Sequence, residues 1–332
     1  MSLGRDARIY VAGHRGLVGS ALVRQLRAAG YENLVLRTHA ELELTDAGAV
    51  RAFFQLEKPQ AVILAAAKVG GILANDTYPA EFIRENLVIQ TNVVHEAWRV
   101  GVDRLLFLGS SCIYPRDCPQ PMKEEYLLTG PLEPTNRAYA VAKIAGIEMC
   151  WSYNRQYGTR YLAVMPTNLF GPGDNYDLET SHVLPALIRK MHEAKERHDS
   201  KTIVWGTGKP RREFLYSDDM ADACAFLVGL PEEKFSRLVS PSTLPLINIG
   251  AGKDITIHEL ARLVAEVVNF SGELVFDPTK PDGMPQKLLD VSYLVSLGWR
   301  SRISLRRGIE LAYQHYRESI EFDPRIARLG SA

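Results

Sequence analysis

The chain of 332 residues is 46% hydrophobic and 23% charged, the composition of an ordinary globular protein with enough apolar side chains for a large core. Thirty-nine basic residues balance thirty-nine acidic ones, so net charge gives no reason to expect binding to nucleic acid or to a membrane surface. No apolar run approaches the length that spans a bilayer, and the four cysteines form no CxxC pair. These features predict a cytoplasmic protein with reduced thiols and no metal site.

The first half of the chain alternates short apolar runs with amphipathic segments, a pattern typical of βα units in a parallel sheet. The apolar runs that we expect to form strands cover residues 8–13, 33–38, 61–67, 104–111 and 161–171. The segments that we expect to form helices cover residues 17–30, 86–100 and 139–157.

The chain changes character after residue 171, where a loop rich in turn-forming residues begins. Beyond this loop we expect a helix at 182–197 and a strand followed by a helix at 213–230. We also expect a strand at 245–252 and a helix at 256–270. Asp218 and Asp219 are expected to cap a helix, and His192 to lie on a solvated helix face.

A glycine-rich loop joins the first strand to the first helix. The segment "VAGHRGLVGS" places Gly13, Gly16 and Gly19 in a G-x-x-G-x-x-G pattern, which also fits turn geometry alone. Its place between a strand and a helix favours a dinucleotide, whose pyrophosphate would rest on the amides at the helix N-terminus. The sequence therefore predicts an α/β fold, a doubly wound parallel Rossmann sheet. The other loop residues expected beside the cofactor are His14, Arg15, Leu17 and Val18.

The end of the second expected strand favours NADPH over NADH. Folds that bind NAD usually carry an acidic residue there for the ribose 2′-hydroxyl, whereas NADP-binding folds carry an arginine. This chain has Arg37 and His39 at that place and Arg15 in the glycine loop, and Glu41 comes late for the acidic role. A guanidinium suits a 2′-phosphate, although Arg37 could also be a solvated side chain without a ligand.

The pattern of elements also suggests two domains. We expect residues 1–175, completed by about 214–249, to form the NADP-binding domain. Residues 176–213 and 250–332 would form a smaller, intertwined α/β C-terminal domain that binds the substrate.

A tyrosine and a lysine indicate a catalytic site. In "NRAYAVAKIAGIE", Tyr139 and Lys143 are four positions apart, so they would share one helix face. A tyrosine with the usual pKa of about 10 is a weak acid–base catalyst at neutral pH. A neighbouring ammonium and a positively charged nicotinamide would lower that pKa. A Tyr-x-x-x-Lys pair is common by chance, but together with the glycine loop and Ser110 at a strand end it favours a reductase site.

With these motifs the chain resembles the extended short-chain dehydrogenase/reductases, and among them the GDP-L-fucose synthases. The resemblance runs from about residue 8 to residue 318 and is carried by "AGHRGLVGSA", "LAAAKVGGI", "NDTYPAEFI", "FLGSSCIYP", "LEPTNRAYAVAKIAGI", "SHVLPALIRK", "REFLYSDDMADA" and "KPDGMPQKLLD". It implies NADPH-dependent 3,5-epimerisation and 4-keto reduction of GDP-4-keto-6-deoxy-D-mannose to GDP-L-fucose. It also implies a homodimer built from the helices near 86–100 and 139–157.

The resemblance also implies roles for single residues. Ser110 and Tyr139 would hydrogen-bond the C4 oxygen of the substrate, and Lys143 would support Tyr139 and the cofactor. The residues that would contact NADPH, besides the glycine loop, are Arg37, His39, Leu108, Gly109, Ser110, Lys143, Pro166, Thr167, Asn168, Leu169 and His182. The residues that would contact the GDP-sugar are Asn168, Lys190, Trp205, Arg212 and Asp282.

Cys112 and His182 would form the pair that epimerises the sugar. The hydrogens at C3 and C5 both lie beside the C4 ketone, so removing either one gives an enolate on the same oxygen. A thiol and an imidazole, with usual pKa values of about 8.5 and 6.5, suit a base and an acid on opposite faces of the ring. An isolated cysteine is more often a small buried hydrophobe, and His182 could simply begin its helix.

Two segments allow more than one sugar in the substrate. The loop "DNYDLETSH" and the segment "FLYSDD" differ from the pattern typical of the family and flank the expected sugar site. The alternatives are a GDP-4-keto-6-deoxy-heptose epimerase/reductase and a relative with only the epimerase or only the 4-reductase activity. A non-enzymatic NADP-sensing module is disfavoured, because such proteins typically lose the tyrosine or the lysine.

Overall fold

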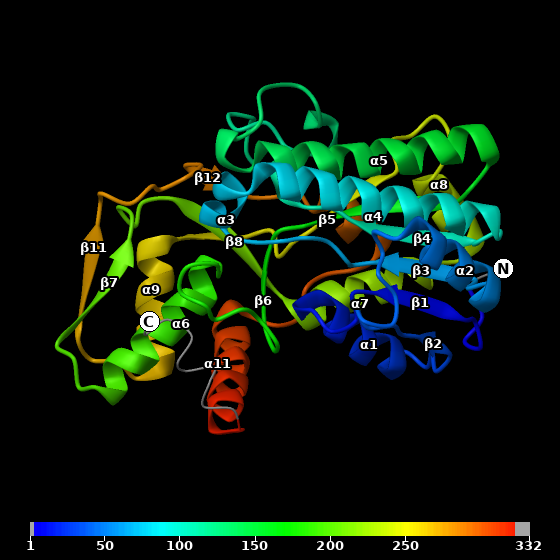
Figure 1. The fold of residues 1–332 in the computed structure, drawn as a ribbon. Helices are drawn as coiled ribbons and strands as arrows, with labels where there is room; N and C mark the ends of the chain where they lie inside the picture. Colours follow the sequence, from blue (N-terminus) through cyan, green and yellow to red (C-terminus); the bar gives the residue numbers. More distant parts are fainter. Residues whose placement is uncertain (1–2, 323–332) are drawn as a thin grey trace.

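A six-stranded parallel sheet forms the centre of the computed structural model, which describes residues 3–322 (Figure 1). Its strand order is β2-β1-β3-β4-β5-β9, with every neighbouring pair parallel. The strands are β1 (Ile9–Ala12), β2 (Leu34–Val35), β3 (Ala61–Leu64), β4 (Arg104–Leu108), β5 (Tyr161–Pro166) and β9 (Leu246–Ile249). The order reverses between β1 and β3, and ligands of such sheets bind at the carboxyl ends of the strands near this reversal.

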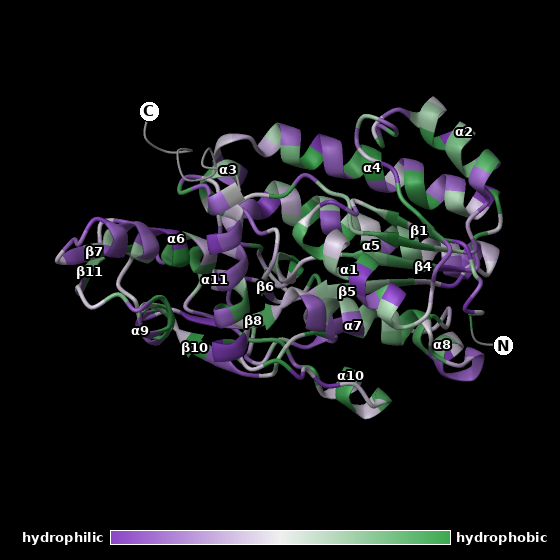
Figure 2. Ribbon diagram, turned by 90° about the horizontal axis from the view of Figure 1, so that it is seen from below, coloured by the Kyte–Doolittle hydropathy of each residue, from purple (hydrophilic) through white to green (hydrophobic). Residues whose placement is uncertain are grey.

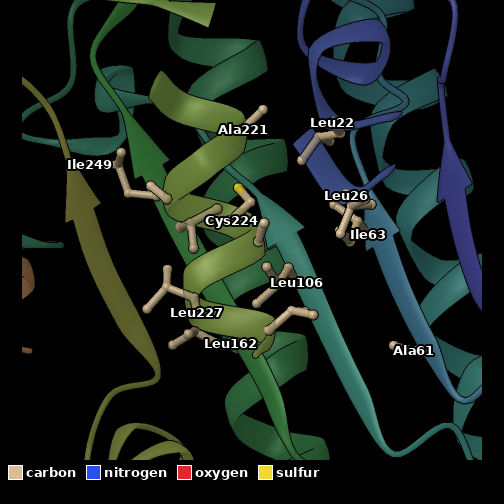
Figure 3. Packing of buried hydrophobic residues seen from close by; sticks show 14 of the residues in the cluster. Leu22, Leu26, Ala61, Ile63, Leu106, Leu162, Ala221, Cys224, Leu227 and Ile249 are labelled. Carbon is tan, nitrogen blue, oxygen red and sulfur yellow. The ribbon is translucent and has the colours of Figure 1, made fainter. Parts of the chain in front are cut away.

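Helices cover both faces of the sheet, which confirms the doubly wound α/β prediction. On one face lie α1 (Leu17–Ala28), α7 (Ser217–Val228), α8 (Glu232–Leu238) and α10 (Ser292–Leu297). On the other face lie α2 (Ala47–Glu57), α4 (Pro79–Arg99) and α5 (Arg137–Tyr157). Figure 3 shows the first of these layers, where Cys224 and Leu227 of α7 point at Leu106 and Leu162 of the sheet. In Figure 2 the central strands are coloured as hydrophobic, while the helix ribbons alternate between hydrophobic and hydrophilic residues, as expected for amphipathic helices.

Helix α5 packs unusually close to the sheet. A Cβ atom at Gly146 would lie 2.2 Å from Cζ of Phe107 in β4, so only glycine fits at this crossing. The close approach brings the first half of α5 beside the end of β4, and the predicted catalytic residues lie on these two elements.

The second lobe, at the left of Figure 1, is built from small sheets and three helices. Its strands are β6 (Asn168–Phe170), β7 (Lys201–Trp205), β8 (Arg211–Tyr216), β10 (Asp254–Thr256), β11 (Glu273–Asp277) and β12 (Gln286–Lys287). Its helices are α6 (Val183–Glu196), α9 (Ile257–Val268) and α11 (Leu305–Phe322). These helices share one hydrophobic core, separate from the two cores that flank the central sheet. One further short helix, α3 (Ile72–Thr77), follows β3.

Some expected elements have different limits. The strand expected over 161–171 is two strands, because after Pro166 the chain leaves the central sheet and β6 pairs with β8 instead. The second strand is only Leu34–Val35, and the helix expected from residue 86 begins already at Pro79, whose fixed φ suits a first helical position.

The two aspartates in the first turn of α7 are not its caps. Tyr216 is the residue before the helix, and no side chain caps it. Asp218 pairs with Arg24 of α1, and Asp219 accepts hydrogen bonds from the backbone of residues 302 and 303. Both carboxylates therefore join α7 to its neighbours rather than end it.

Residues 214–249 contribute α7, α8 and β9 to the first lobe. Strand β8 spans the boundary at residue 214 and pairs with the strands of the second lobe. We keep the division into a domain of residues 1–175 with 214–249 and a domain of 176–213 with 250–332 as a proposal. Within residues 3–322, no helix is long and apolar enough to cross a membrane.

Candidate active site

Two of the three loop glycines are required by the packing of the fold itself. Gly13 has a positive φ of 83°, and a Cβ there would lie 2.8 Å from the backbone nitrogen of Ala66. A Cβ at Gly19 would lie 1.9 Å from the carbonyl oxygen of Gly13. Gly13 therefore lies too close to the segment after β3, and Gly19 too close to Gly13 itself, for side chains at these positions.

Gly16 has no such structural reason. A Cβ there would meet only the carbonyl oxygen of Gly13, at an ordinary 3.5 Å. Gly16 precedes the first turn of α1, where no side chain caps the helix and no acidic residue lies. His14 lies two residues before Gly16. Its Nδ1 atom is buried and has no hydrogen-bond partner among residues 3–322. A helix N-terminus with free amides and a bare backbone beside it fits the pyrophosphate of a dinucleotide.

The residues expected to hold a 2′-phosphate have partners within the protein. Arg37 pairs with Glu57 and donates to the carbonyl oxygen of Leu36 at 2.9 Å. His39 is exposed, and its Nε2 lies 2.6 Å from Glu43. Arg15 is exposed in the glycine loop.

The carboxylate of Glu41, the acidic residue considered for the ribose 2′-hydroxyl, is engaged in a local turn. Its carboxylate accepts hydrogen bonds from the backbone and hydroxyl of Thr38 at 2.7 and 2.8 Å. These bonds, and to a smaller degree the charges of Arg37 and Arg15, lower the pKa of Glu41. The carboxylate is thus occupied, and the two guanidinium groups lie near enough to act on it.

The end of β4 carries the serine and the cysteine into a short 3-10 turn over Ser111–Ile113. Ser110 has extended backbone angles, and its Oγ accepts a hydrogen bond from the backbone of Cys112 at 3.5 Å. Nζ of Lys143 donates to the carbonyl oxygen of Leu108 at 2.8 Å. The lysine of α5 is therefore anchored to the strand that presents the serine and the cysteine.

Tyr139 and Lys143 lie on the same face of α5. Nζ of Lys143 is 5.6 Å from the centre of the Tyr139 ring and 4.9 Å from that of Phe107. Burial lowers the pKa of Lys143 to about 8, although Cys112 acts in the opposite direction. Burial also raises the pKa of Tyr139, and Cys112 adds to this effect. Burial thus dominates the pKa of Tyr139 in this structure, and the lowering expected from Lys143 together with a positively charged nicotinamide stays a prediction.

Cys112 is buried beside these groups. Burial raises the pKa of its thiol. Lys287, a hydrogen bond with Ser110 and the charge of Lys143 act in the opposite direction. The thiolate form therefore depends on two ammonium groups, of which one was not expected.

Lys287 is the residue of this site that the sequence did not indicate. It lies in β12, which pairs with β8 so that Lys287 is opposite Arg212. Lys287 is half-buried, and burial lowers its pKa while Cys112 raises it. Its segment "KPDGMPQKLLD" could be read only as a loop, since nothing local predicts its pairing with β8.

His182 immediately precedes α6 and keeps an exposed surface. It is nevertheless largely surrounded by protein, and this burial, together with the charge of Lys287, lowers its pKa. Lys287 thus acts on both members of the predicted epimerisation pair, so Cys112 and His182 both lie within electrostatic range of one ammonium group.

The segment Pro166–Leu169 passes from β5 to β6 beside the same site. Nδ2 of Asn168 donates to the carbonyl oxygen of Glu213 at 2.7 Å, and Oγ1 of Thr167 donates to the same oxygen at 3.2 Å. Because its amide nitrogen is engaged, Asn168 can offer its side-chain oxygen to a ligand. Glu213 is itself fully buried and accepts from the backbones of Gly252 and Leu289.

The residues expected to contact the GDP-sugar lie in the second lobe. Nζ of Lys190 is 4.8 Å from the ring centre of Trp205. Arg212 donates to the carbonyl oxygen of Asp282 at 3.2 Å, and burial lowers its pKa. Both carboxylate oxygens of Asp282 accept hydrogen bonds from Thr207, at 2.7 Å each. Asp282 therefore holds the turn after Trp205.

His192, expected on a solvated face, is buried. Its Nδ1 lies 3.1 Å from the hydroxyl of Tyr313, and burial lowers its pKa. Helix α11 covers this side of α6, and nothing near His192 in the sequence predicts that contact. Among residues 3–322, no cluster of three or more His, Cys, Asp or Glu side chains could hold a metal ion.

The sequence profile of the NAD-dependent epimerase/dehydratase family matches residues 9–239 of this chain. The chain belongs to this family. The match spans the glycine loop, the end of β4 and the Tyr139–Lys143 pair, and the family name agrees with a site built around a nicotinamide dinucleotide.

Relatives in the family cover nearly the whole chain. GDP-L-fucose synthase 1 of Arabidopsis thaliana is 57% identical over 316 residues, 95% of this chain and 95% of that protein. GDP-L-fucose synthase of Escherichia coli is 54% identical over 94% of this chain and 97% of that protein. A solved structure of a GDP-mannoheptose C4 reductase from Campylobacter jejuni with NADP bound is 41% identical, with a TM-score of 0.85 over 95% of this chain and all of that one.

Proposed function

We propose that this protein catalyses the NADPH-dependent 3,5-epimerisation and 4-keto reduction of GDP-4-keto-6-deoxy-D-mannose to GDP-L-fucose. The observation that carries the proposal is the buried thiol of Cys112 beside the Tyr139–Lys143 pair. A reductase needs a proton donor and a lysine, whereas an epimerase also needs a base next to the carbonyl. The relatives named GDP-L-fucose synthase support the same function.

Ser110 and Tyr139 would serve both reactions. The enolate formed at C3 or C5 and the alkoxide formed at C4 carry their charge on the same oxygen. Hydroxyl donors aimed at that oxygen stabilise both species without rearrangement. One site can therefore run the epimerisations and the reduction in turn.

The epimerisation pair would work in a minor protonation state. Burial raises the pKa of Cys112 and lowers that of His182, so the neutral thiol and the neutral imidazole dominate near pH 7. The active form has the same number of protons, but the proton of the Cys112 thiol has moved to His182. Cys112 is then the thiolate base, and His182 is the imidazolium acid. Epimerisation should therefore follow a bell-shaped pH profile whose limits belong to the pair.

The reduction uses Tyr139 as an acid. NADPH, when bound, supplies a hydride to C4. Burial raises the pKa of Tyr139, so the phenol keeps its proton until the more basic alkoxide forms and then donates it to the C4 oxygen. Lys143, held by the Leu108 carbonyl, fixes the position of a positive charge beside the tyrosine ring.

The decisive experiment is product identification by NMR. The purified protein is incubated in D₂O with NADPH and GDP-4-keto-6-deoxy-D-mannose. We expect GDP-L-fucose with deuterium at C3 and C5. A product that keeps the D-manno configuration, or no oxidation of NADPH, would contradict the proposal.

Two variants assign the epimerisation. Cys112→Ser should abolish deuterium incorporation at C3 and C5, and His182→Asn should slow it by about 100-fold. Tyr139→Phe serves as the matched comparison, because it should stop NADPH oxidation while exchange at C3 and C5 continues at a reduced rate. Undiminished exchange in Cys112→Ser would remove the assigned base.

A heptose substrate is the second candidate. The GDP-mannoheptose C4 reductase from Campylobacter jejuni, at 41% identity, favours it. Competition between GDP-4-keto-6-deoxy-D-mannose and the corresponding GDP-linked 4-keto-heptose, measured as the ratio of kcat/KM values, separates the two. A higher kcat/KM for the heptose would replace our assignment.

We also propose a homodimer in which α4 and α5 pack against the same helices of a second copy. Trp98 stacks on Tyr157 with ring centres 4.3 Å apart, and Tyr157 is 44% exposed. These rings lie on the helices that the family resemblance assigns to the dimer. Light scattering after gel filtration tests the state, and Tyr157→Glu should shift it toward monomer. We expect the cytoplasm as the compartment, consistent with four cysteines that are all free thiols.

A further inference from the structure

Trp205 is an exposed indole flanked by two lysines. It ends strand β7, which pairs with β11 in the two-stranded ribbon at the left of Figure 1, and it is 47% exposed. Nζ of Lys190, from α6, lies 4.8 Å from the ring centre, and Nζ of Lys280, from the loop after β11, lies 5.2 Å from it. Two positive charges from different elements thus meet at one aromatic ring.

The two lysines differ in their surroundings. Nζ of Lys190 donates to the carbonyl oxygen of Ile203 at 3.4 Å. Hydrogen bonds from Thr279 and, to a smaller degree, the charge of Lys280 lower the pKa of Asp277, so this carboxylate lies within electrostatic range of Lys280. Burial and the charge of Lys280 lower the pKa of Lys190. Two like charges brought together at one ring repel each other, and an anion between them would remove that repulsion.

Hydrogen bonds fix the positions of the two nearby carboxylates. Asp282 accepts from Thr207, as described above, and Oδ1 of Asp277 accepts from the backbone and hydroxyl of Thr279 at 3.0 and 2.6 Å. These hydrogen bonds hold the turns on both sides of Trp205 in place. The positive charges therefore stay available to a ligand on a rigid support.

The loop that carries Lys280 is also tied to Arg212, a half-buried arginine of the site. Arg212 donates to the carbonyl oxygen of Asp282, two residues after Lys280. Arg212 in turn lies opposite Lys287, whose charge acts on Cys112. A run of positive groups thus leads from Trp205 toward the thiol, and this direction suits a ligand with a diphosphate between an aromatic base and a sugar.

We propose that Lys280 is a substrate-binding residue that, together with Lys190, binds the diphosphate of the GDP-sugar beside Trp205. The proposal rests on the proposed function, because a GDP-sugar supplies both the diphosphate and a base for the indole. The Nζ atoms of Lys190 and Lys280 would each donate to phosphate oxygens, and Trp205 would keep the two ammonium groups apart and oriented.

Calorimetric titration of the intact protein with GDP tests this assignment. Lys280→Gln should weaken GDP binding by about tenfold, the usual effect of losing one charge-assisted contact. Lys190→Gln should have a similar effect. The fold loss of GDP affinity in the double variant should be smaller than the product of the losses in the two single variants. The reason is that removing either charge also removes the repulsion that GDP relieves.

Lys201→Gln is the matched control. Lys201 is an equally exposed lysine at the opposite end of β7, paired with Glu273 rather than Asp277. The Lys201→Gln variant should bind GDP as tightly as the unchanged protein does. The melting temperatures of Lys280→Gln, Lys190→Gln and Lys201→Gln should lie within a few degrees of that of the unchanged protein. In steady-state assays the loss in Lys280→Gln should be in KM for the GDP-sugar and not in KM for NADPH.

The outcomes separate this inference from the proposed function. If the unchanged protein binds GDP and Lys280→Gln binds it as tightly as Lys201→Gln does, the role of Lys280 is wrong and the proposed function stands. If the unchanged protein does not bind GDP at all, both fail. A loss of NADPH affinity in Lys280→Gln equal to its loss of GDP affinity would also overturn the assignment, since it would indicate a general structural change.

Discussion

The backbone N–H of Gly71 donates a hydrogen bond to the carbonyl oxygen of Thr180 at 3.1 Å. This bond joins the segment after β3, in the first lobe, to the loop that ends two residues later at His182. Within the loop, Asp177 accepts from the backbones of Glu179 and Thr180 and holds the turn that precedes His182. The contact therefore ties the position of the imidazole to the central sheet.

Gly71→Ala should slow epimerisation. A Cβ at this position would lie 3.1 Å from the carbonyl oxygens of both Thr180 and Ser181, so the loop must move by a few tenths of an ångström. Displacing a catalytic group on this scale costs about tenfold in rate. The measurement is deuterium incorporation at C3 and C5, with NADPH affinity as the internal standard.

Glu179→Ala is the control for this prediction. Glu179 is exposed in the same loop, and only its backbone takes part in the turn. The rate of deuterium incorporation at C3 and C5 in Glu179→Ala should equal that of the unchanged protein. If Gly71→Ala behaves in the same way, the hydrogen bond does not position His182.

Lys287→Met should move the pH profile of epimerisation to higher pH. The ammonium lowers the pKa of Cys112 and also that of His182. Removing the charge raises both values, so both limbs of the bell shift in the same direction. Exchange rates at C3 and C5 measured from pH 5 to pH 10 follow both limbs, and an unshifted bell would exclude electrostatic coupling. Lys123→Met, at an exposed lysine outside the site, should leave the profile in place.

The loop glycines should separate binding from stability. Gly16→Ala should leave the melting temperature nearly unchanged and weaken NADPH binding by at least tenfold, because the fold accommodates a Cβ there and a pyrophosphate does not. Gly19→Ala should lower the free energy of unfolding by about 3 kcal/mol, because its Cβ would overlap the backbone of Gly13. Thermal melting and fluorescence titration with NADPH measure the two effects. Equal losses of stability in both variants would mean that Gly16 also serves packing.

Arg104→Met should destabilise the protein by about 3 kcal/mol. Arg104 is fully buried, and its Nη1 donates to the carbonyl oxygens of Val228 and Leu230 at 2.6 and 2.8 Å. The substitution leaves both carbonyls without a donor at the end of α7. Urea unfolding measures the loss, and Arg237→Met, at an exposed arginine, should change stability by less than about 0.5 kcal/mol. An Arg104→Met protein as stable as Arg237→Met would show that water replaces the guanidinium.

The sequence alone determined the repeated βα pattern, the glycine loop and the Tyr139–Lys143 pair. These features are local: a strand followed by a helix, a spacing of four on one helix, and hydroxyl and thiol groups at a strand end are all visible within a few residues. The division of the expected strand over 161–171 into β5 and β6 was not visible, because the residues after Pro166 remain apolar while their pairing partner changes to β8.

Only the tertiary structure decided which charges meet at the site. Lys287 lies 175 positions after Cys112 in the numbering, and only the pairing of β12 with β8 brings its charge to the thiol. In the same way, the packing of α11 on α6 buries His192, and the loop after β11 places Lys280 beside Trp205. The types of group follow from the sequence, but their pKa values and electrostatic partners depend on contacts between distant segments, which local patterns do not encode.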